Sequence, residues 1–183
     1  WDVMLSYTQR DGESTVLVES MYHSFRENGL SVWLDIKMNK LNEAAMEEGV
    51  KGCRCVIAVM SGADSNDPNA YFNRAFCVKE LIWAQDAGVA IQPVCAAEDK
   101  KNIGSFIGQA EAKGIRNLGS TDIIHLDRSR IAYWNVGFGE VLTAVREQIA
   151  NSAGSSQRSS SSGERKTSSV VSAHCLNTWT YIF

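Results

Sequence analysis

One carboxylate, Glu80, lies in a stretch, FCVKELIWA (76–84), that otherwise has the pattern of the buried side of a helix. Residues three and four apart share a face of a helix, so Glu80 would lie between the rings of Phe76 and Trp83. No basic residue stands at these spacings. The stretch leaves two interpretations open: an acid without a role at the rim of an apolar stripe, or an acid with a chemical task.

Hydroxyl groups gather in a second stretch, SYTQRDGEST (6–15), which follows the first candidate strand. Hydroxyls at the start of a helix could hold a phosphate, so a flavin mononucleotide site is an alternative. Other phosphate motifs are missing, since the chain has no G-x-x-x-x-G-K-[ST] loop and GFGEVL (137–142) breaks the G-x-G-x-x-G spacing. A phospho-acceptor receiver domain would need acids at the ends of the first and third strands, where none occurs.

The composition is that of a soluble globular protein, with 44% hydrophobic and 21% charged residues in a chain of 183. No apolar run approaches the length of a membrane span. The net charge is −3 and Lys and Arg do not cluster, which argues against nucleic acid as a partner. The five cysteines stand in apolar segments or near the chain end, so we expect reduced thiols and a cytoplasmic protein. Cysteine and histidine spacings predict no metal site.

Apolar strand candidates alternate with amphipathic helix patterns along the first 150 residues. This alternation predicts an α/β fold: a flavodoxin-like, doubly wound parallel sheet of five strands with helices on both faces. Within the third strand, Cys53 and Cys55 are expected to face the same side. The strand candidates are 2–7, 31–36, 53–61, 89–96 and 122–127, and a helical pattern follows each of them.

The last helix, roughly 134–150, leads into a segment of different composition. From residue 152 onward serine dominates, so we divide the chain into a folded domain, 1–151, and a disordered tail, 152–183. The apolar end of the tail, VVSAHCLNTWTYIF, fits either a docking peptide or a stray end. The chain opens at Trp1 on a candidate strand, and we expect it to be a fragment of a longer protein. The residues expected on the inner side of the last helix are Val136, Val141, Leu142, Val145 and Ile149.

The predicted fold indicates where a ligand would bind. In an open α/β sheet this is the crevice at the carboxyl ends of the strands, beside the point where the strand order reverses. For a flavodoxin-like order that point lies between the first and third strands. The loops after these strands, SYTQRDGES and MSGADSNDPNAYF, therefore form the expected site together with the helix that carries Glu80.

Several segments, in this order and spacing, resemble Toll/interleukin-1 receptor (TIR) domains, and the resemblance covers about residues 1–150. FCVKEL resembles the tryptophan-cysteine-x-x-glutamate-leucine box of the NAD-cleaving members, with Phe76 in place of the tryptophan. WDVMLSYTQRDG is similar to the first strand and loop, VWLDI to the second strand leading into the BB loop, CVIAVMS to the third strand and IQPV to the fourth.

The resemblance implies hydrolysis of NAD⁺ at the nicotinamide–ribose bond, with Glu80 as the catalytic glutamate. Nicotinamide leaves as a neutral group, so the transition state is an oxocarbenium-like ribose that a nearby negative charge stabilises while also holding the sugar hydroxyls. Phe76 and Trp83 would restrict water around that charge. NAD⁺ is then the substrate, and no cofactor or metal is expected.

Three further residues are candidates for substrate binding. Tyr7 could stack on the nicotinamide or ribose, or simply lie at the rim of the core. Arg10 could meet a phosphate, although NAD-cleaving relatives often have arginine closer to the aromatic residue, where this chain has Thr8 and Gln9. Ser61, after the third strand, could line the pocket or cap a turn.

The BB loop bears on the choice between two functions that the family supplies. Asp35 and Lys37 stand at the beginning of this loop. In the family the loop gates the pocket and makes assembly contacts, so both residues are candidates for substrate binding; a solvated turn is the alternative. Many receptor and adaptor members have a proline here, whereas the only prolines of this chain are Pro68 and Pro93. We therefore expect an NAD⁺ glycohydrolase that acts in signalling, cell-death or immune-type responses through TIR–TIR self-association. A non-catalytic TIR–TIR interaction module is the alternative, and the sequence leaves a linear or a cyclic ADP-ribose product open.

Overall fold

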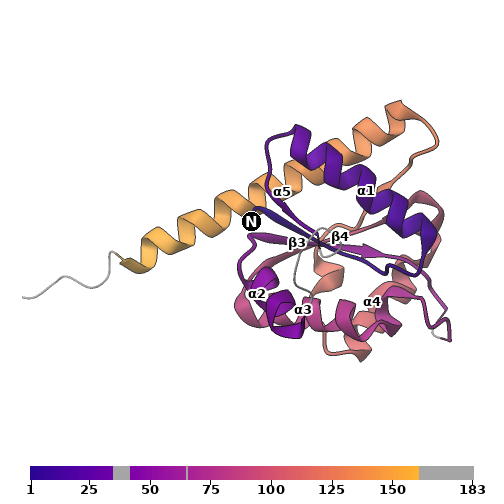
Figure 1. Cartoon of the computed structure of the whole chain (residues 1–183), viewed down its shortest axis with the longest axis horizontal. Coiled ribbons are helices and arrows are strands. Elements are labelled where there is room, and N and C mark those ends of the chain that lie inside the picture. Colours follow the sequence, from indigo (N-terminus) through magenta and orange to yellow (C-terminus); the bar gives the residue numbers. More distant parts are fainter. Residues whose placement is uncertain (35–41, 65, 161–183) are drawn as a thin grey trace, which may run out of the picture.

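A parallel five-stranded sheet forms the centre of the molecule (Figure 1). The computed structural model describes residues 1–34, 42–64 and 66–160, with side chains up to residue 151. In these ranges the strand order is β2-β1-β3-β4-β5 and every pairing is parallel, which confirms the predicted fold class. The strands are β1 (Val3–Ser6), β2 (Val32–Trp33), β3 (Cys55–Met60), β4 (Ala90–Ala96) and β5 (Ile124–Leu126).

Helices cover both faces of the sheet because the chain moves across it in two directions. The crossover from β1 to β2 runs one way and the later crossovers run the other way, so right-handed connections put their helices on opposite faces. Helices α1 and α5 lie on one face, and α2, α3 and α4 lie on the other (Figure 1). The helices are α1 (Gly12–Glu27), α2 (Glu43–Lys51), α3 (Ala75–Ala87), α4 (Ile103–Ala112) and α5 (Ile131–Ser160), with 3-10 turns η2 (Tyr71–Asn73), η3 (Ala97–Asn102) and η4 (Leu118–Ser120).

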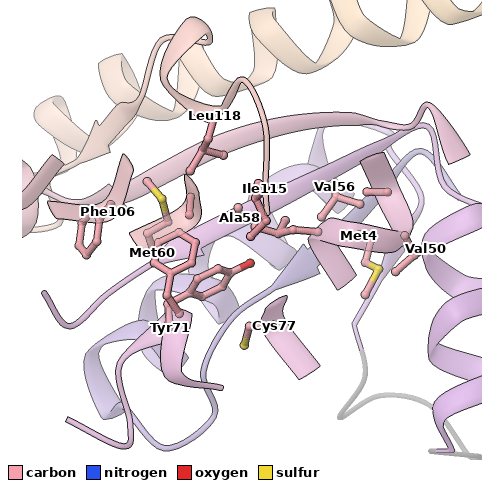
Figure 2. Close-up of a cluster of buried hydrophobic side chains, with 14 of the residues drawn as sticks. Met4, Val50, Val56, Ala58, Met60, Tyr71, Cys77, Phe106, Ile115 and Leu118 are labelled. Carbon is pink, nitrogen blue, oxygen red and sulfur yellow. The ribbon is translucent and has the colours of Figure 1, made fainter. Parts of the chain in front are cut away.

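Alternate residues of the central strand β3 enter two separate cores, one on each face of the sheet. Every residue of β3 is buried, as expected for a parallel strand that is covered on both faces. One core lies under α2, α3 and α4 and contains Tyr71 and Phe106 (Figure 2). The other lies under α1 and α5 and contains Phe25 and Phe138. Strand β3 contributes Val56, Ala58 and Met60 to the first core and Cys55, Ile57 and Val59 to the second.

The prediction that Cys53 and Cys55 face the same side is wrong. Cys53 lies in the core under α2 and its thiol donates to the Val50 carbonyl at 3.0 Å, whereas Cys55 lies in the opposite core. Alternation does not apply because the strand begins only at Cys55. Burial raises the pKa of each thiol to about 12.

The inner side of α5 differs from the prediction at one residue. Val141, Leu142, Val145 and Ile149 pack against the core as expected, but Val136 is 66% exposed and its predicted inward direction is wrong. The neighbouring Gly137 faces the sheet instead, since an added Cβ there would lie 3.1 Å from the Leu126 side chain. Successive residues of a helix point about 100° apart, so Val136 is turned away from β5.

Helix α5 also continues beyond the expected start of the tail at residue 152, as far as Ser160. No proline interrupts this stretch. The rest of the serine-rich tail, residues 161–183, lies outside the described residues.

Candidate functional site

Glu80 lies in the second turn of α3, on the side of the helix that packs against the sheet. It is only 5% exposed, and α3 also buries Cys77, Leu81 and Ala84 on this side. The acid is therefore not a solvated residue at the rim of an apolar stripe. A buried carboxylate is costly unless hydrogen bonds satisfy it.

One buried hydroxyl group provides such a hydrogen bond, and a second hydroxyl contacts the first. The hydroxyl of Ser6, the last residue of β1, donates to Glu80 Oε2 at 2.5 Å. Its oxygen also lies 2.6 Å from the hydroxyl of Tyr71, which begins η2. Burial, and after it the charges of Cys77 and Glu80, raises the pKa of Tyr71 well above its ordinary value. The tyrosine hydroxyl therefore keeps its proton and remains a donor.

A cavity of about 360 Å³ lies beside Glu80 at the carboxyl end of β1. It is enclosed by the loop after β1, the start of α2 and the first turns of α3. The Cys77 thiol donates to the Tyr7 carbonyl at 3.3 Å, which ties α3 to the end of β1. The lining residues are Tyr7, Thr8, Gln9, Arg10, Asn42, Glu43, Met46, Arg74, Phe76, Cys77 and Glu80.

Positive charge reaches this cavity from two sides. Arg10 lies in the loop after β1, and Arg74 is the residue that directly precedes α3. Glu43, at the start of α2, forms an ion pair with Lys79 of α3 at 2.5 Å, and this pair links the two helices beside the cavity. The two guanidinium groups suit an anionic ligand such as a phosphate, which arginine binds through two parallel hydrogen bonds.

The structure brings some of the predicted substrate-binding residues together and separates others. Arg10 and Phe76 line the cavity with Glu80, and Phe76 is 45% exposed. Tyr7 also borders the cavity, but its side chain is 6% exposed and packs in the core under α1 and α5, which fits the alternative of a tyrosine at the rim of the core. Ser61 lines a neighbouring cavity of about 530 Å³, which shares Arg10 with the first. Trp83 lies one turn further along α3, where it packs against the core and does not line the described cavity. Asp35 and Lys37 lie outside the described residues.

Sequence reasoning missed the hydrogen bond from Ser6 to Glu80, the contact of Tyr71 with Ser6 and one of the arginines. Ser6 is 74 residues away from Glu80 in the chain, and Tyr71 belongs to the separate turn η2. No rule of sequence spacing links either residue to Glu80. Arg74 could have been found, because it stands directly before the helix that carries Glu80. It adds a second positive charge to the cavity, beside that of Arg10.

The hydroxyl-rich start of α1 has little room for the phosphate of a flavin. The Asp11 side chain caps this helix and accepts from the backbone N–H groups of Glu13 and Ser14. The Ser14 hydroxyl donates to the same carboxylate, and the Thr15 hydroxyl donates to the Asp11 carbonyl. These donors at the start of α1 already have an internal acceptor, which counts against a flavin phosphate at this helix.

Neither a metal site nor a membrane-spanning helix is found in the described part of the chain. No group of three or more His, Cys, Asp or Glu side chains there could hold a metal ion. Within the same residues, no helix combines the length and apolar character that crossing a bilayer requires.

The fold and the site define an α/β protein with a buried carboxylate beside the point where the strand order reverses. The family model for the TIR domain matches residues 3–122, more than half of the chain, and the chain belongs to the TIR domain family. No curated protein matches it. Among solved structures, it is similar to the TIR domains of the activated Roq1 resistosome that directly recognises the pathogen effector XopQ. The identity is 15% over 76% of this chain and 81% of that chain, with a TM-score of 0.40.

Proposed function

We propose that this TIR domain is an NAD⁺ glycohydrolase that releases nicotinamide and forms an ADP-ribose product. One observation carries the proposal: Glu80 is buried, accepts a hydrogen bond from Ser6 and still lines a cavity at the carboxyl end of β1. A packing role gives little reason for this acid, because an apolar side chain would fill the same position at lower cost.

The reaction breaks the bond between the ribose C1′ and the nicotinamide nitrogen. The electron pair leaves with nicotinamide, which becomes neutral, while positive charge develops on the ribose. The Glu80 carboxylate stabilises this charge, and its effect is strong because the surroundings exclude water. Water that attacks C1′ gives linear ADP-ribose, whereas attack by the adenine ring gives a cyclic product.

The other cavity residues hold the substrate around this centre. Phe76, which is 45% exposed at the cavity, offers a ring face to the nicotinamide or ribose. Arg10 and Arg74 pair with the pyrophosphate. NAD⁺ is the substrate in this proposal, and the reaction uses no further cofactor.

The proposal extends to the biological setting. The reaction would serve signalling, cell-death or immune-type responses, and the domains would self-associate through TIR–TIR contacts. The buried free thiols of Cys53, Cys55, Cys77 and Cys95 support a cytoplasmic location, because a reducing compartment keeps thiols in this state.

The test measures nicotinamide release from NAD⁺ by the purified protein and by Glu80→Gln. This substitution removes the charge and keeps the shape, and we expect a loss of about 100-fold or more in kcat. Glu48→Gln, at an exposed glutamate of α2, is the matched control and should keep full activity. Circular dichroism verifies that both variants fold.

If the domain must self-associate to be active, nicotinamide release depends on the protein concentration. The assay is repeated at high concentration and with the protein crowded on a surface. If the wild type then releases no nicotinamide, or if Glu80→Gln matches the wild type, the enzymatic proposal fails. The non-catalytic interaction module then remains.

A further inference from the structure

We propose that Ser6 and Tyr71 are positioning residues, which form a hydrogen-bond relay that holds the Glu80 carboxylate ionised and in one orientation. The relay runs from the Tyr71 hydroxyl to Ser6 Oγ, and from Ser6 Oγ to Glu80 Oε2. Its catalytic consequence rests on the proposed function. Its effect on the ionisation of Glu80 can be measured without any reaction.

The direction of both hydrogen bonds follows from the number of protons. An ionised carboxylate only accepts, and a serine hydroxyl carries a single proton. The proton of Ser6 goes to Glu80 at 2.5 Å, so the 2.6 Å contact between Ser6 and Tyr71 uses the proton of the tyrosine. Tyr71 therefore donates to a serine that itself donates to a charged group, and each bond polarises the next.

The relay residues come from three elements that leave them little freedom. Ser6 ends β1, Tyr71 begins η2 and Glu80 lies in α3. The Tyr71 ring packs edge-on against Phe72, with centroids 5.1 Å apart, and its backbone N–H donates to the Ser61 carbonyl at 2.9 Å. Figure 2 shows Tyr71 within the core, with its hydroxyl oxygen in red. Because Ser6 and Tyr71 are 1% and 0% exposed, bulk water has no access to replace either hydroxyl.

Other charged groups also influence the ionisation of Glu80. The arginines at the cavity favour its charged form, whereas the carboxylate of Glu43 disfavours it. A substitution in the relay leaves all of these groups in place, so it tests the relay separately from them. Among the described residues, the titratable and charged groups at the site are Tyr7 and Arg10 after β1, Glu43 on α2, Tyr71 on η2, and Arg74 and Cys77 at the start of α3.

Loss of the relay should raise the pKa of Glu80. Hydrogen bonds to the charged form favour that form, so their removal moves the pKa upward. A reaction that needs the ionised carboxylate slows as the pH falls through this pKa, and the acid side of the kcat/KM profile reports it. A hydrogen bond to a charged group changes an equilibrium constant roughly tenfold, which corresponds to a shift of about one pH unit.

Four substitutions isolate the relay. Tyr71→Phe removes one oxygen and keeps the ring in the core, and Tyr133→Phe, at a half-exposed tyrosine of α5, is its control. Ser6→Ala interrupts the relay at its middle. Ser20→Ala is the control for it, because the Ser20 hydroxyl donates only to the Val16 carbonyl of its own helix, α1, and Ser20 does not line the cavity. A fifth variant, Ser6→Thr, keeps a hydroxyl and should restore the relay.

The experiment has two readouts on each variant. The first is the pH profile of kcat/KM for nicotinamide release, and the second is the ionisation midpoint of Glu80. NMR of protein with ¹³C-labelled glutamate carboxyls gives this midpoint, and Glu80→Gln assigns the signal. We expect both midpoints to rise by about one unit in Ser6→Ala and by a smaller amount in Tyr71→Phe, because the tyrosine hydroxyl acts on Glu80 only through Ser6. The two controls and Ser6→Thr should stay near the wild-type value.

The readouts separate the relay from the proposed function. Equal NMR midpoints in the wild type and in both relay variants would overturn the relay, as would an equal shift in the controls. A wild type that releases no nicotinamide would count against the proposed function alone, because the NMR midpoints still decide whether the relay sets the ionisation of Glu80.

Discussion

A methyl group added at Gly62 should destabilise the segment that carries Tyr71. Gly62 follows Ser61 after β3 and has a φ of +69°, in the left-handed region. An added Cβ would lie 2.8 Å from the Ala70 Cα and 2.9 Å from the Ala70 Cβ, and neither atom can rotate out of the way. Gly62→Ala therefore combines an unfavourable backbone conformation with a steric clash.

Gly88→Ala shows the backbone effect without the clash. Gly88 ends α3 with a φ of +68°, and an added Cβ would meet no described atom within 4 Å. The left-handed conformation costs a residue with a Cβ roughly 1–2 kcal/mol, which is the loss we expect for Gly88→Ala. Overpacking adds roughly 1–3 kcal/mol, so the free energy of unfolding should fall by about 2–5 kcal/mol in Gly62→Ala.

Urea denaturation followed by far-UV circular dichroism measures both losses, provided that the two variants keep the same m value. In thermal unfolding, each kcal/mol should lower the midpoint by about 2–4 °C in a domain of this size. Equal losses in the two variants would refute the steric argument. Because the affected segment leads to Tyr71, Gly62→Ala should also reduce nicotinamide release, whereas Gly88→Ala should not.

Two further substitutions test single polar groups. Thr8 is 1% exposed and its hydroxyl has no hydrogen-bond partner among the described residues, so Thr8→Val should keep or raise the free energy of unfolding, by up to about 1 kcal/mol; a clear loss in urea denaturation would contradict this. Hydrogen bonds from the Ser31 backbone and side chain lower the pKa of Asp2 below its ordinary value of 3.8. The ionised Asp2 carboxylate stabilises the folded state above pH 3.8, and this stabilisation disappears as the pH falls through the lower pKa of the folded state. Asp2→Asn should therefore flatten the decline of the thermal midpoint in that acid range. If the thermal midpoint of Asp2→Asn declines with falling pH as steeply as that of the wild type, this role of Asp2 is refuted.

The fold could be predicted from the sequence because its signal is local. A central parallel strand is buried on both faces, so β3 has a nearly continuous apolar sequence that needs no tertiary information to be found. The sequence predictions were wrong where a tertiary contact decides which side of an element faces the core. The inward side of α5 is set by the close approach of Gly137 to β5 and by the packing of Phe138, and a count of aliphatic residues misassigned Val136.

The site was predictable only in part, for a related reason. An acid on an apolar helix face is unusual and drew attention to Glu80, but only the resemblance to the TIR box gave it a role. Its partner Ser6 is 74 residues away, and the contact exists only because β1 and α3 meet in the folded chain. Ser61 follows the strand next to β1 and was expected beside Glu80, yet the two residues line neighbouring cavities, because α2 and α3 enclose the space at β1.

The reversal of strand order explains how Glu80 can be buried and still lie next to a cavity. From β1 the chain leaves over one face through α1, while α2 and α3 lie on the other face and leave a space between them at the end of β1. Ser6 ends that strand, so its hydroxyl is fixed by the sheet before any ligand arrives and needs no reorganisation during a reaction. An interaction module gives these buried polar groups no task, although they cost stability relative to an apolar core. Stabilisation of a positive charge in the cavity gives them one, which is why we favour the enzymatic hypothesis.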